Sequence, residues 1–228
     1  MIRRYSATLA ILGIVQVSFG QGWNLEKDFE TASNPNGAWS YGSTYILGGF
    51  TAFTNTSNVP NEYPNAASGW SKQSFALPYV AQNVSGATTF GGWHPGDILM
   101  HSWAHDMPVS RWTAPSTIRS TVSLTASFRR IEGPPNVSDW WILDNGATLS
   151  SGQLFIIDQQ ATFSQSLTVH AGDVIDFVVG YEDRGSGANA TGLNVNAQFQ
   201  ATKTVPGPAS MLGFGIPALG RLLKRKKK

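Results

Sequence analysis

The stretch Thr121-Val122-Ser123-Leu124-Thr125-Ala126-Ser127-Phe128 alternates hydroxyl and apolar side chains at every position. Successive side chains of a β-strand point to opposite faces, so the apolar residues share one face and the hydroxyls share the other. One apolar and one polar face is typical of an antiparallel sheet that covers a core on one side and meets water on the other. The stretch therefore predicts an antiparallel β-protein.

Shorter segments of this kind recur between turn-forming residues along the chain. We expect strands at 38–54 (one or two, broken at Gly48-Gly49), 69–77, 79–82, 97–101, 109–113, 139–143, 147–149, 153–158, 161–170, 173–181 and 193–199. Residues 23–30 fit an amphipathic strand, with a short helix as the alternative. Asp144-Asn145-Gly146 is a strong hairpin signal. The segment 173–181 is apolar on both faces except at Asp176, which fits a central strand.

No long helical period appears between residues 21 and 203. Roughly ten short strands at turn-punctuated spacing predict an all-β fold, a two-sheet antiparallel β-sandwich of the jelly-roll kind. At 228 residues, the chain is long enough for one such domain with a sizeable core. We place the sandwich domain at 21–203, between a leader at 1–20 and a tail at 204–228.

The charges divide between the ends of the chain and its body. Of the 16 basic residues, Arg3 and Arg4 lie in the leader, and six others lie in the tail: Arg221, Lys224, Arg225, Lys226, Lys227 and Lys228. The body therefore contains eight basic residues and all 14 acidic residues, which gives it a net charge of about −6. Because phosphate binding needs a basic face, a nucleic-acid partner is not expected. The chain has no cysteine, which excludes disulfides and thiolate metal sites.

Both ends of the chain have the anatomy of targeting segments. A dibasic start, a mostly apolar run at 7–19 and the small residues Ser18 and Gly20 predict a secretory signal peptide cut before Gln21. At the other end, a Pro-x-Pro break is followed by fifteen residues (209–223), interrupted by Pro217 and Arg221, and then by a basic cluster. This order predicts a short membrane stop whose basic end stays cytoplasmic.

The tail resembles the PEP-CTERM sorting signal of bacteria, which a membrane transpeptidase called exosortase handles. Val205, Pro206, Gly207 and Pro208 stand where the family usually has Val-Pro-Glu-Pro, so this chain lacks the glutamate. The resemblance implies export, transient residence in the inner membrane and delivery to the cell envelope, surface or extracellular matrix. The alternative is a generic single-span anchor or a frayed basic tail.

The body has a resemblance of its own. The stretches 34–42 (Asn-Pro-Asn-Gly-Ala-Trp-Ser-Tyr-Gly), 111–115 (Arg-Trp-Thr-Ala-Pro) and 171–180 (Ala-Gly-Asp-Val-Ile-Asp-Phe-Val-Val-Gly) are similar to β-sandwich bodies that often precede PEP-CTERM tails. Those bodies have no established enzymatic role, and their form is similar to carbohydrate-binding modules. The resemblance therefore implies a non-catalytic protein of the envelope or exopolysaccharide matrix.

Few residues form a pattern that favours catalysis or metal binding. His101 and His105, beside Asp106, could form a histidine pair for zinc only on a helix, and the neighbourhood predicts strand and loop. Asp173 and Asp176 would point to opposite faces of a strand, so they do not form the facing carboxylate pair of a glycosidase. We expect no cofactor and no metal site. Calcium at loop oxygens is compatible with such a sandwich, although no loop matches the EF-hand pattern.

Tryptophans are the best candidates for binding. The chain has eight, and an exposed indole offers a flat apolar platform for a sugar ring. Trp93 and Trp103 lie in predicted loops, and of the adjacent Trp140 and Trp141 one must face outward if both lie on a strand. The alternative is that these rings close the ends of the sandwich.

Three functions remain open from the sequence. The first is an exported, non-catalytic β-sandwich that binds glycans weakly. The others are a secreted glycan-active hydrolase and a purely structural or adhesive surface protein. They differ in whether the protein binds polysaccharide, cleaves it, or does neither.

Overall fold

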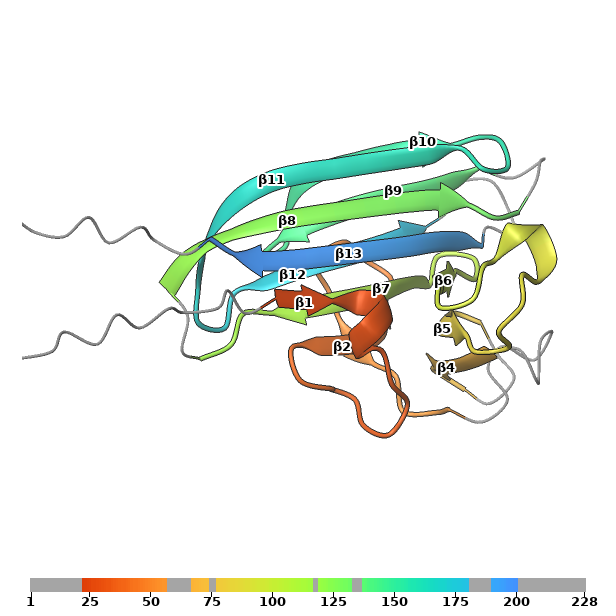
Figure 1. The fold of residues 1–228 in the computed structure, drawn as a ribbon, viewed down its shortest axis with the longest axis horizontal. Coiled ribbons are helices and arrows are strands. Elements are labelled where there is room, and N and C mark those ends of the chain that lie inside the picture. The colour runs from red at the N-terminus through yellow and green to blue at the C-terminus, as the bar shows by residue number, and fades with distance from the viewer. Residues whose placement is uncertain are drawn as a thin grey trace, which may run out of the picture.

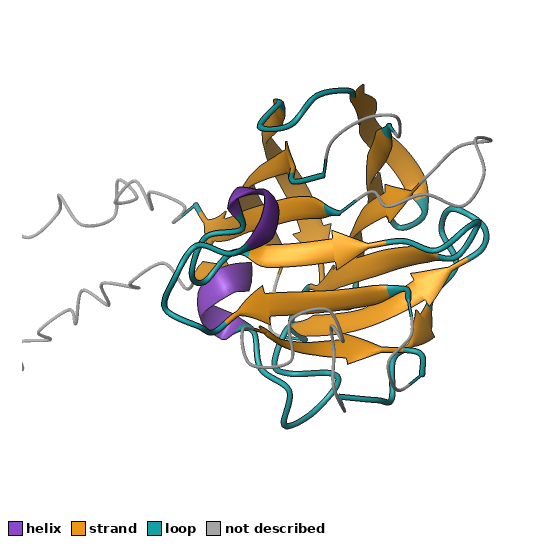
Figure 2. Cartoon of the chain, turned by 90° about the vertical axis from the view of Figure 1, so that its right-hand side faces the viewer, coloured by secondary structure: helices purple, strands orange, loops and turns teal. Residues whose placement is uncertain are grey.

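The computed structural model describes residues 22–56, 67–73, 77–116, 119–132, 137–180 and 190–200. Two antiparallel sheets pack face to face as a β-sandwich, which confirms the predicted fold class (Figure 1). Strands make up most of the described chain, and helix is confined to α1 (Leu25–Asp28) and the 3-10 turn η1 (Phe90–Gly92) (Figure 2).

The first sheet has seven strands in the order β11-β8-β13-β6-β5-β4, with β1 beside the end of β13. Their bounds are β1 (Gly22–Asn24), β4 (Ala67–Ser71), β5 (Tyr79–Asn83), β6 (Ile98–His101), β8 (Arg119–Arg130), β11 (Gln160–His170) and β13 (Thr191–Phe199). One edge of β13 pairs with β8 along its full length, while the other edge meets β6 first and β1 later. The final strand of the chain thus lies inside this sheet.

The second sheet has six strands in the order β10-β9-β12-β7-β2-β3. Their bounds are β2 (Trp39–Thr44), β3 (Thr51–Ala52), β7 (Met107–Thr113), β9 (Ser138–Asp144), β10 (Ala147–Leu154) and β12 (Val174–Gly180). β12 lies between β9 and β7, so the predicted central strand at 173–181 is confirmed.

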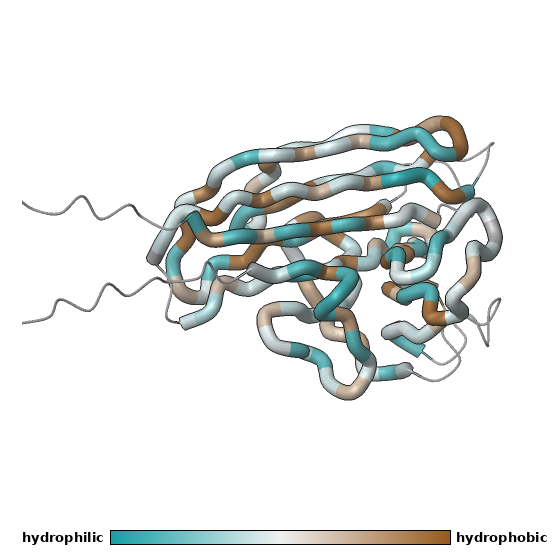
Figure 3. Tube along the Cα trace, in the orientation of Figure 1, coloured by the Kyte–Doolittle hydropathy of each residue, from teal (hydrophilic) through white to brown (hydrophobic). Residues whose placement is uncertain are grey.

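The main core fills the space between the sheets. Val122, Leu124, Ala126 and Phe128 of β8 all face it, as the alternation predicts. The tube coloured by hydropathy shows the same alternation along the strands of the first sheet (Figure 3). Large rings dominate this core, with Trp39, Tyr41, Trp112 and Phe177 almost fully buried. The abundance of tryptophan is therefore mostly a packing feature.

Two predictions about secondary structure needed correction. The predicted strands at 147–149 and 153–158 are one strand, β10, which ends at Leu154. Residues 155–159 form a turn instead, because the Gln159 side chain accepts hydrogen bonds from the Phe155 and Ile156 backbone N–H groups. At the start of the described chain, both alternatives are realised: β1 is a strand and α1 follows it, capped by the Asn24 side chain.

The predicted leader (1–20) and tail (204–228) lie outside the described residues. None of the helices in the described part of the chain is long and apolar enough to cross a membrane. The two ends of the described chain lie together, because Gly22 pairs with Gln198 beside the end of β13 (Figure 1).

Candidate functional site: an aromatic end pocket and a polar sheet pocket

Of the four candidate tryptophans, one is well exposed. Trp93 is 1% exposed and Trp140 is also buried, where it stacks on Phe128 with ring centroids 4.9 Å apart. Trp141 faces outward from β9, as the adjacent pair predicts, but it packs against a small buried cluster on the outer face of the second sheet, formed by Val109, Leu143 and Val178. Trp103 is 52% exposed. The first two rings therefore cannot serve as sugar platforms, and Trp103 can.

Trp103 is held by a tight turn between β6 and β7. Its backbone N–H and carbonyl pair with the carbonyl and N–H of Asp106, at 3.0 and 2.8 Å. Ala104 takes a positive φ of 51° in this turn, a conformation that costs an L-residue about 1–2 kcal/mol. Strained backbone of this kind persists where surrounding structure holds it. The indole is thus carried on a short, hydrogen-bonded turn rather than on a long loop.

Trp103 lines a pocket at one end of the sandwich, which we call the end pocket. It offers about 790 Å³ of space, part of it open to solvent. Its lining comes from the loops after β2, β4 and β6: Tyr45, Lys72, Gln73, Leu77, Trp103, Ala104, His105 and Asp106. Tyr45 is 63% exposed, so two accessible aromatic rings share this pocket.

Polar groups of the end pocket are organised around Lys72, whose ammonium lies over the Tyr45 ring, 4.7 Å from its centroid. Its ammonium group donates to Asp106 Oδ2 at 3.0 Å and to the Tyr45 hydroxyl at 3.1 Å. The hydrogen bonds to Tyr45 and Asp106 raise the pKa of Lys72, so it stays charged at neutral pH. Asp106 is buried, and its Oδ1 accepts no hydrogen bond from the described residues. The pocket thus combines aromatic faces with fixed donors and an acceptor.

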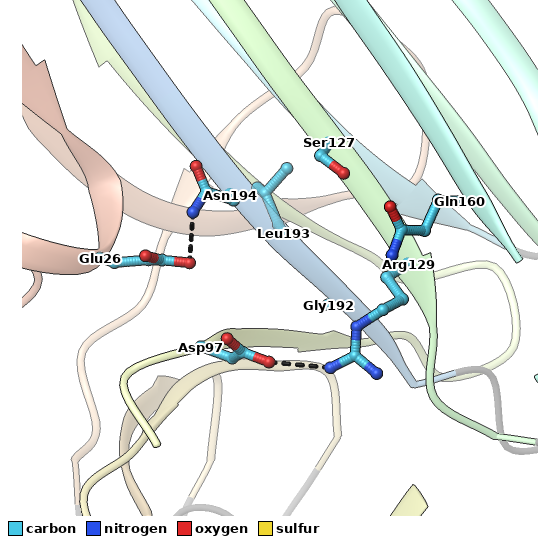
Figure 4. Close-up of a pocket in the computed structure, with 8 residues that line it drawn as sticks. All are labelled: Glu26, Asp97, Ser127, Arg129, Gln160, Gly192, Leu193 and Asn194. Atoms are coloured by element: carbon cyan, nitrogen blue, oxygen red, sulfur yellow. Dashed lines mark hydrogen bonds and ion pairs between the residues drawn. The ribbon is translucent and has the colours of Figure 1, made fainter. Parts of the chain in front are cut away.

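A second pocket, which we call the sheet pocket, lies on the outward face of the first sheet (Figure 4). It offers about 380 Å³ of space, part of it open to solvent, and is lined by Glu26, Asp97, Ser127, Arg129, Gln160, Gly192, Leu193 and Asn194. Arg129 projects from β8 and bonds Asp97 at 2.8 Å and Asp158 at 3.0 Å. Asn194 on β13 donates to Glu26 Oε1 at 2.5 Å.

The two carboxylates of the sheet pocket differ in their surroundings. Burial raises the pKa of Glu26, and the charge of Asp97 raises it further, against the hydrogen bond from Asn194. Asp97 has the Arg129 guanidinium beside it. A partly desolvated acid beside an ion-paired one is the kind of asymmetry that acid–base sites use, although ion-pair networks with a purely structural role produce it as well.

The histidine and aspartate candidates have structural partners. His101 is buried, with Nδ1 2.9 Å from the Ser102 carbonyl oxygen, while His105 lies exposed at the end pocket. Within the described ranges, no group of three or more metal-ligating side chains comes together. Asp176 is paired with Arg111 through bonds of 2.6 and 2.8 Å. Asp173 accepts from the His170 backbone N–H at 2.7 Å, which lowers its pKa.

Sequence reasoning singled out Trp103, His105 and Asp106 but not Tyr45 and Lys72. Tyr45 and Lys72 lie in two other loops, and no local pattern links them to Trp103. The sheet pocket was missed for the same reason, because Glu26, Asp97 and Arg129 come from a helix, a turn and a strand. The one available signal was the run of amides at Asn194, Asn196 and Gln198 on the polar face of the last predicted strand.

No family model and no curated protein matches the chain. Among solved structures, it is similar to the CBM22-1 xylan-binding domain of Paenibacillus barcinonensis Xyn10C, with 10% identity over 80% of this chain and 97% of that one, at a TM-score of 0.34. It is also similar to ZmpB of Clostridium perfringens, a structure of CBM51-2 with GlcNAc and INT domains (12% identity, 46% of this chain, 22% of that one, TM-score 0.33).

A third similar structure is a carbohydrate-binding module, CBM36, in complex with calcium and xylotriose, with 10% identity over 44% of this chain and 78% of that one, at a TM-score of 0.29. This chain spans less than a quarter of the ZmpB chain. At TM-scores this low, the likenesses assign neither a family nor a ligand. On its own strand order and packing, the described chain is a two-sheet antiparallel β-sandwich.

Proposed function

We propose that this chain is an exported, non-catalytic β-sandwich protein of the bacterial cell envelope or exopolysaccharide matrix, which binds glycans at the end pocket. The observation that carries the binding proposal is that two exposed rings, Trp103 and Tyr45, line one pocket together with the Lys72–Asp106 pair. Sugar rings have apolar faces and hydroxyl edges. Aromatic platforms between fixed donors and acceptors match both features.

The mixture of groups in the end pocket favours a glycan over other small ligands. Lys72 is already paired with Asp106, so the described residues that line the pocket offer no unpaired lysine or arginine that would select a phosphate or another anion. Gln73 and His105 line the pocket and form no side-chain hydrogen bond with the described residues, which leaves their donors and acceptors for a ligand. Affinity would be modest, because the pocket is open and a ligand there keeps part of its hydration.

Absence of catalysis is part of the proposal. Glycoside hydrolysis requires two carboxyl groups on either side of the bond that is cleaved. Asp106 is the one carboxylate among the residues that line the end pocket, and it is bonded to Lys72. Glu26 and Asp97 both line the sheet pocket. If the protein were a glycan-active hydrolase, these two residues would be the candidate catalytic carboxylates.

Export and sorting rest on the leader and the tail. The signal-peptide pattern at 1–20 and the PEP-CTERM-like order at 205–228 support delivery across the inner membrane and handling by an exosortase-like transpeptidase. An exposed aromatic pocket on an acidic body is consistent with a partner outside the cell, where polysaccharide is the abundant polymer. We propose no cofactor.

The end pocket predicts one decisive substitution. Trp103→Ala should weaken binding of the best polysaccharide in a glycan screen by at least tenfold, about 1.4 kcal/mol, because it removes the platform but no core packing. Trp103→Phe should keep part of the affinity. Affinity electrophoresis of the full-length chain measures the loss, and a blue shift of tryptophan fluorescence on binding should disappear in Trp103→Phe.

Phe155→Ala is the matched control, because Phe155 is also 52% exposed but lies in the loop between β10 and β11. Equal losses in both variants would show that general surface hydrophobicity, not the end pocket, causes retention. Binding of no polysaccharide at all would leave the structural or adhesive role. Release of reducing ends that Glu26→Gln abolishes would contradict the non-catalytic assignment and establish the hydrolase.

A further inference from the structure

The outward face of β8, β11 and β13 is a regular array of hydroxyl and amide side chains. Strand register places them in rows across the three strands: Thr162–Ser127–Asn194, Ser164–Thr125–Asn196, Ser166–Ser123–Gln198 and Thr168–Thr121–Gln200. Neighbouring strands are about 4.8 Å apart, and alternate residues along a strand are about 6.7 Å apart. We call this array the hydroxyl face.

The hydroxyl face carries neither charge nor large apolar groups in these rows. Charged or titratable residues follow past both ends of the rows: Arg129, Glu26 and Asp97 form the sheet pocket at one end, and the register continues to the pair His170–Arg119 at the other. A polyanion would find no cation along the rows to neutralise it. A protein partner would bury many hydroxyls with little apolar gain, whereas the cores of protein interfaces are apolar. The chemistry of this face therefore selects an uncharged, polar partner.

The amides and the hydroxyls of this face differ in how they are satisfied. On β13, a relay runs from Asn24 Nδ2 to Asn196 Oδ1 at 2.6 Å, from Asn196 Nδ2 to Asn194 Oδ1 at 3.3 Å, and from Asn194 to Glu26. On β8 and β11, Ser166 accepts from Gln200 at 3.0 Å. The other hydroxyls in the rows form no side-chain hydrogen bond with described residues, so water is their partner.

These hydroxyls are arranged in advance for a ligand. Four threonines in the rows are β-branched and have few χ1 rotamers, and each row is fixed by backbone pairing to its neighbour. Exchange of water for a ligand hydroxyl gains little at one position, because the hydrogen bond that is formed replaces another. These small gains in binding free energy add up over many aligned positions when the ligand is a polymer that contacts several rows at once.

The sheet pocket lies at one end of the rows and is lined mainly by polar side chains. Figure 4 shows Ser127, Arg129 and Gln160 from two neighbouring strands directed to the same space as Glu26 and Asp97. Gln160 has no side-chain partner among the described residues, while Arg129 is held by Asp97 and Asp158. A ligand that follows the rows would therefore meet a cluster of oriented donors and acceptors at this end.

We propose that the hydroxyl face, together with the sheet pocket, is a second binding surface, and that its ligand is an uncharged, hydroxyl-rich polysaccharide chain. This surface is separate from the end pocket and does not depend on aromatic stacking. Two surfaces on one molecule let a single protein contact two polymer segments, which suits a matrix protein because weak contacts gain strength by multivalency.

Near-isosteric loss of hydroxyls tests this surface. In a Trp103→Ala background, full-length protein with Thr121, Thr125, Thr162 and Thr168 each changed to Val keeps strand-forming residues but loses four hydroxyls. Affinity electrophoresis uses two uncharged polymers, hydroxyethylcellulose and galactomannan, with the polyanion alginate for comparison. Trp103→Ala alone should still be retarded by an uncharged polymer, and the four added substitutions should reduce that retention at least fivefold. Alginate should retard neither protein.

The matched control changes Thr51 and Thr148 to Val, because both are exposed strand threonines of the other sheet. Ser164→Glu is the second variant if the valines unfold the protein, and it should also reduce retention at least fivefold. Unchanged retention in both variant sets, equal retention by alginate, or no retention of the wild type by either uncharged polymer overturns the proposal. If Trp103→Ala leaves all binding intact while the valines remove it, the end pocket fails and the hydroxyl face stands.

Discussion

Asp176 is an acid in the middle of an apolar central strand, and Arg111 on the neighbouring strand makes that position tolerable. The two residues are directly opposed in the register of β12 and β7, and the guanidinium holds both carboxylate oxygens. Arg111 also packs over the Phe50 ring, 4.2 Å from its centroid. A buried charge is accepted only when it is paired and hydrogen-bonded, as here. The sequence predicted an acid within a central strand, but the identity of its partner required the register.

Glu26 supports a prediction about pH. Its pKa is raised by burial, so folding disfavours the ionised form, and this cost appears as the pH rises above the unfolded-state pKa of about 4.3. Glu26→Gln should therefore raise the melting temperature at pH 7 relative to wild type and give no gain near pH 3.5. Thermal unfolding at both pH values measures this. Glu30→Gln, an exposed neighbour, is the control, and an equal gain at both pH values for Glu26→Gln would contradict the assignment.

At the scale of elements, short-range turn chemistry was the most predictable feature. The hairpin between β9 and β10 has Asn145 at φ 49° and Gly146 at φ 84°, as the Asp-Asn-Gly signal predicts. The side chain of Asn145 also accepts a hydrogen bond from the Val174 N–H at 3.0 Å, which ties the hairpin to β12. Asn145 therefore both adopts the left-handed conformation of the turn and accepts the hydrogen bond from β12.

Substitutions at Asn145 should separate these two tasks. Asn145→Gly keeps the positive φ and loses the hydrogen bond, at a cost of about 1 kcal/mol of unfolding free energy. Asn145→Ala loses the bond and also forces a left-handed alanine, so it should cost about 1–2 kcal/mol more. Urea unfolding monitored by tryptophan fluorescence gives both values. An alanine variant as stable as the glycine variant would show that the turn changes its conformation to avoid the strain.

Elsewhere, element boundaries depended on long-range geometry. Residues 153–158 have the composition of a strand, with Phe155, Ile156 and Ile157 in a row, yet β10 ends at Leu154. The chain must cross there from the second sheet to β11 in the first, and it does so through a turn that leaves these three residues exposed. Apolar composition alone could not reveal a crossover between sheets.

On the scale of the whole molecule, the ends and the end pocket lie far apart. Gly22 pairs with Gln198 at the end of β13, whereas the loop that carries Trp103 follows β6, which pairs with the start of β13. Both ends of the described chain thus emerge at one pole of the sandwich, and β4 and β6, whose loops contribute to the end pocket, lie toward the opposite pole (Figure 1).

The tail predicts a change of location without a change of binding. Deletion of 205–228 should move the protein from the cell envelope to the medium, because the proposed membrane stop and basic cluster are lost. Fractionation of cells and medium by immunoblot measures the shift, and the released protein should keep the glycan affinity of the full-length chain. Retention of the full-length chain in the cytosol would contradict both targeting assignments.

The sequence by itself determined the β-sandwich class, the central strand and the hairpin, because side-chain alternation and turn chemistry are local properties of the chain. It also indicated tryptophans as the candidate binding residues. The tertiary structure alone decided which tryptophan is exposed, since the burial of a side chain depends on which residues from distant segments pack against it. It also brought Tyr45, Lys72 and Trp103 into one pocket, and three strands into one hydroxyl face, because these contacts arise from pairings between segments far apart in the chain.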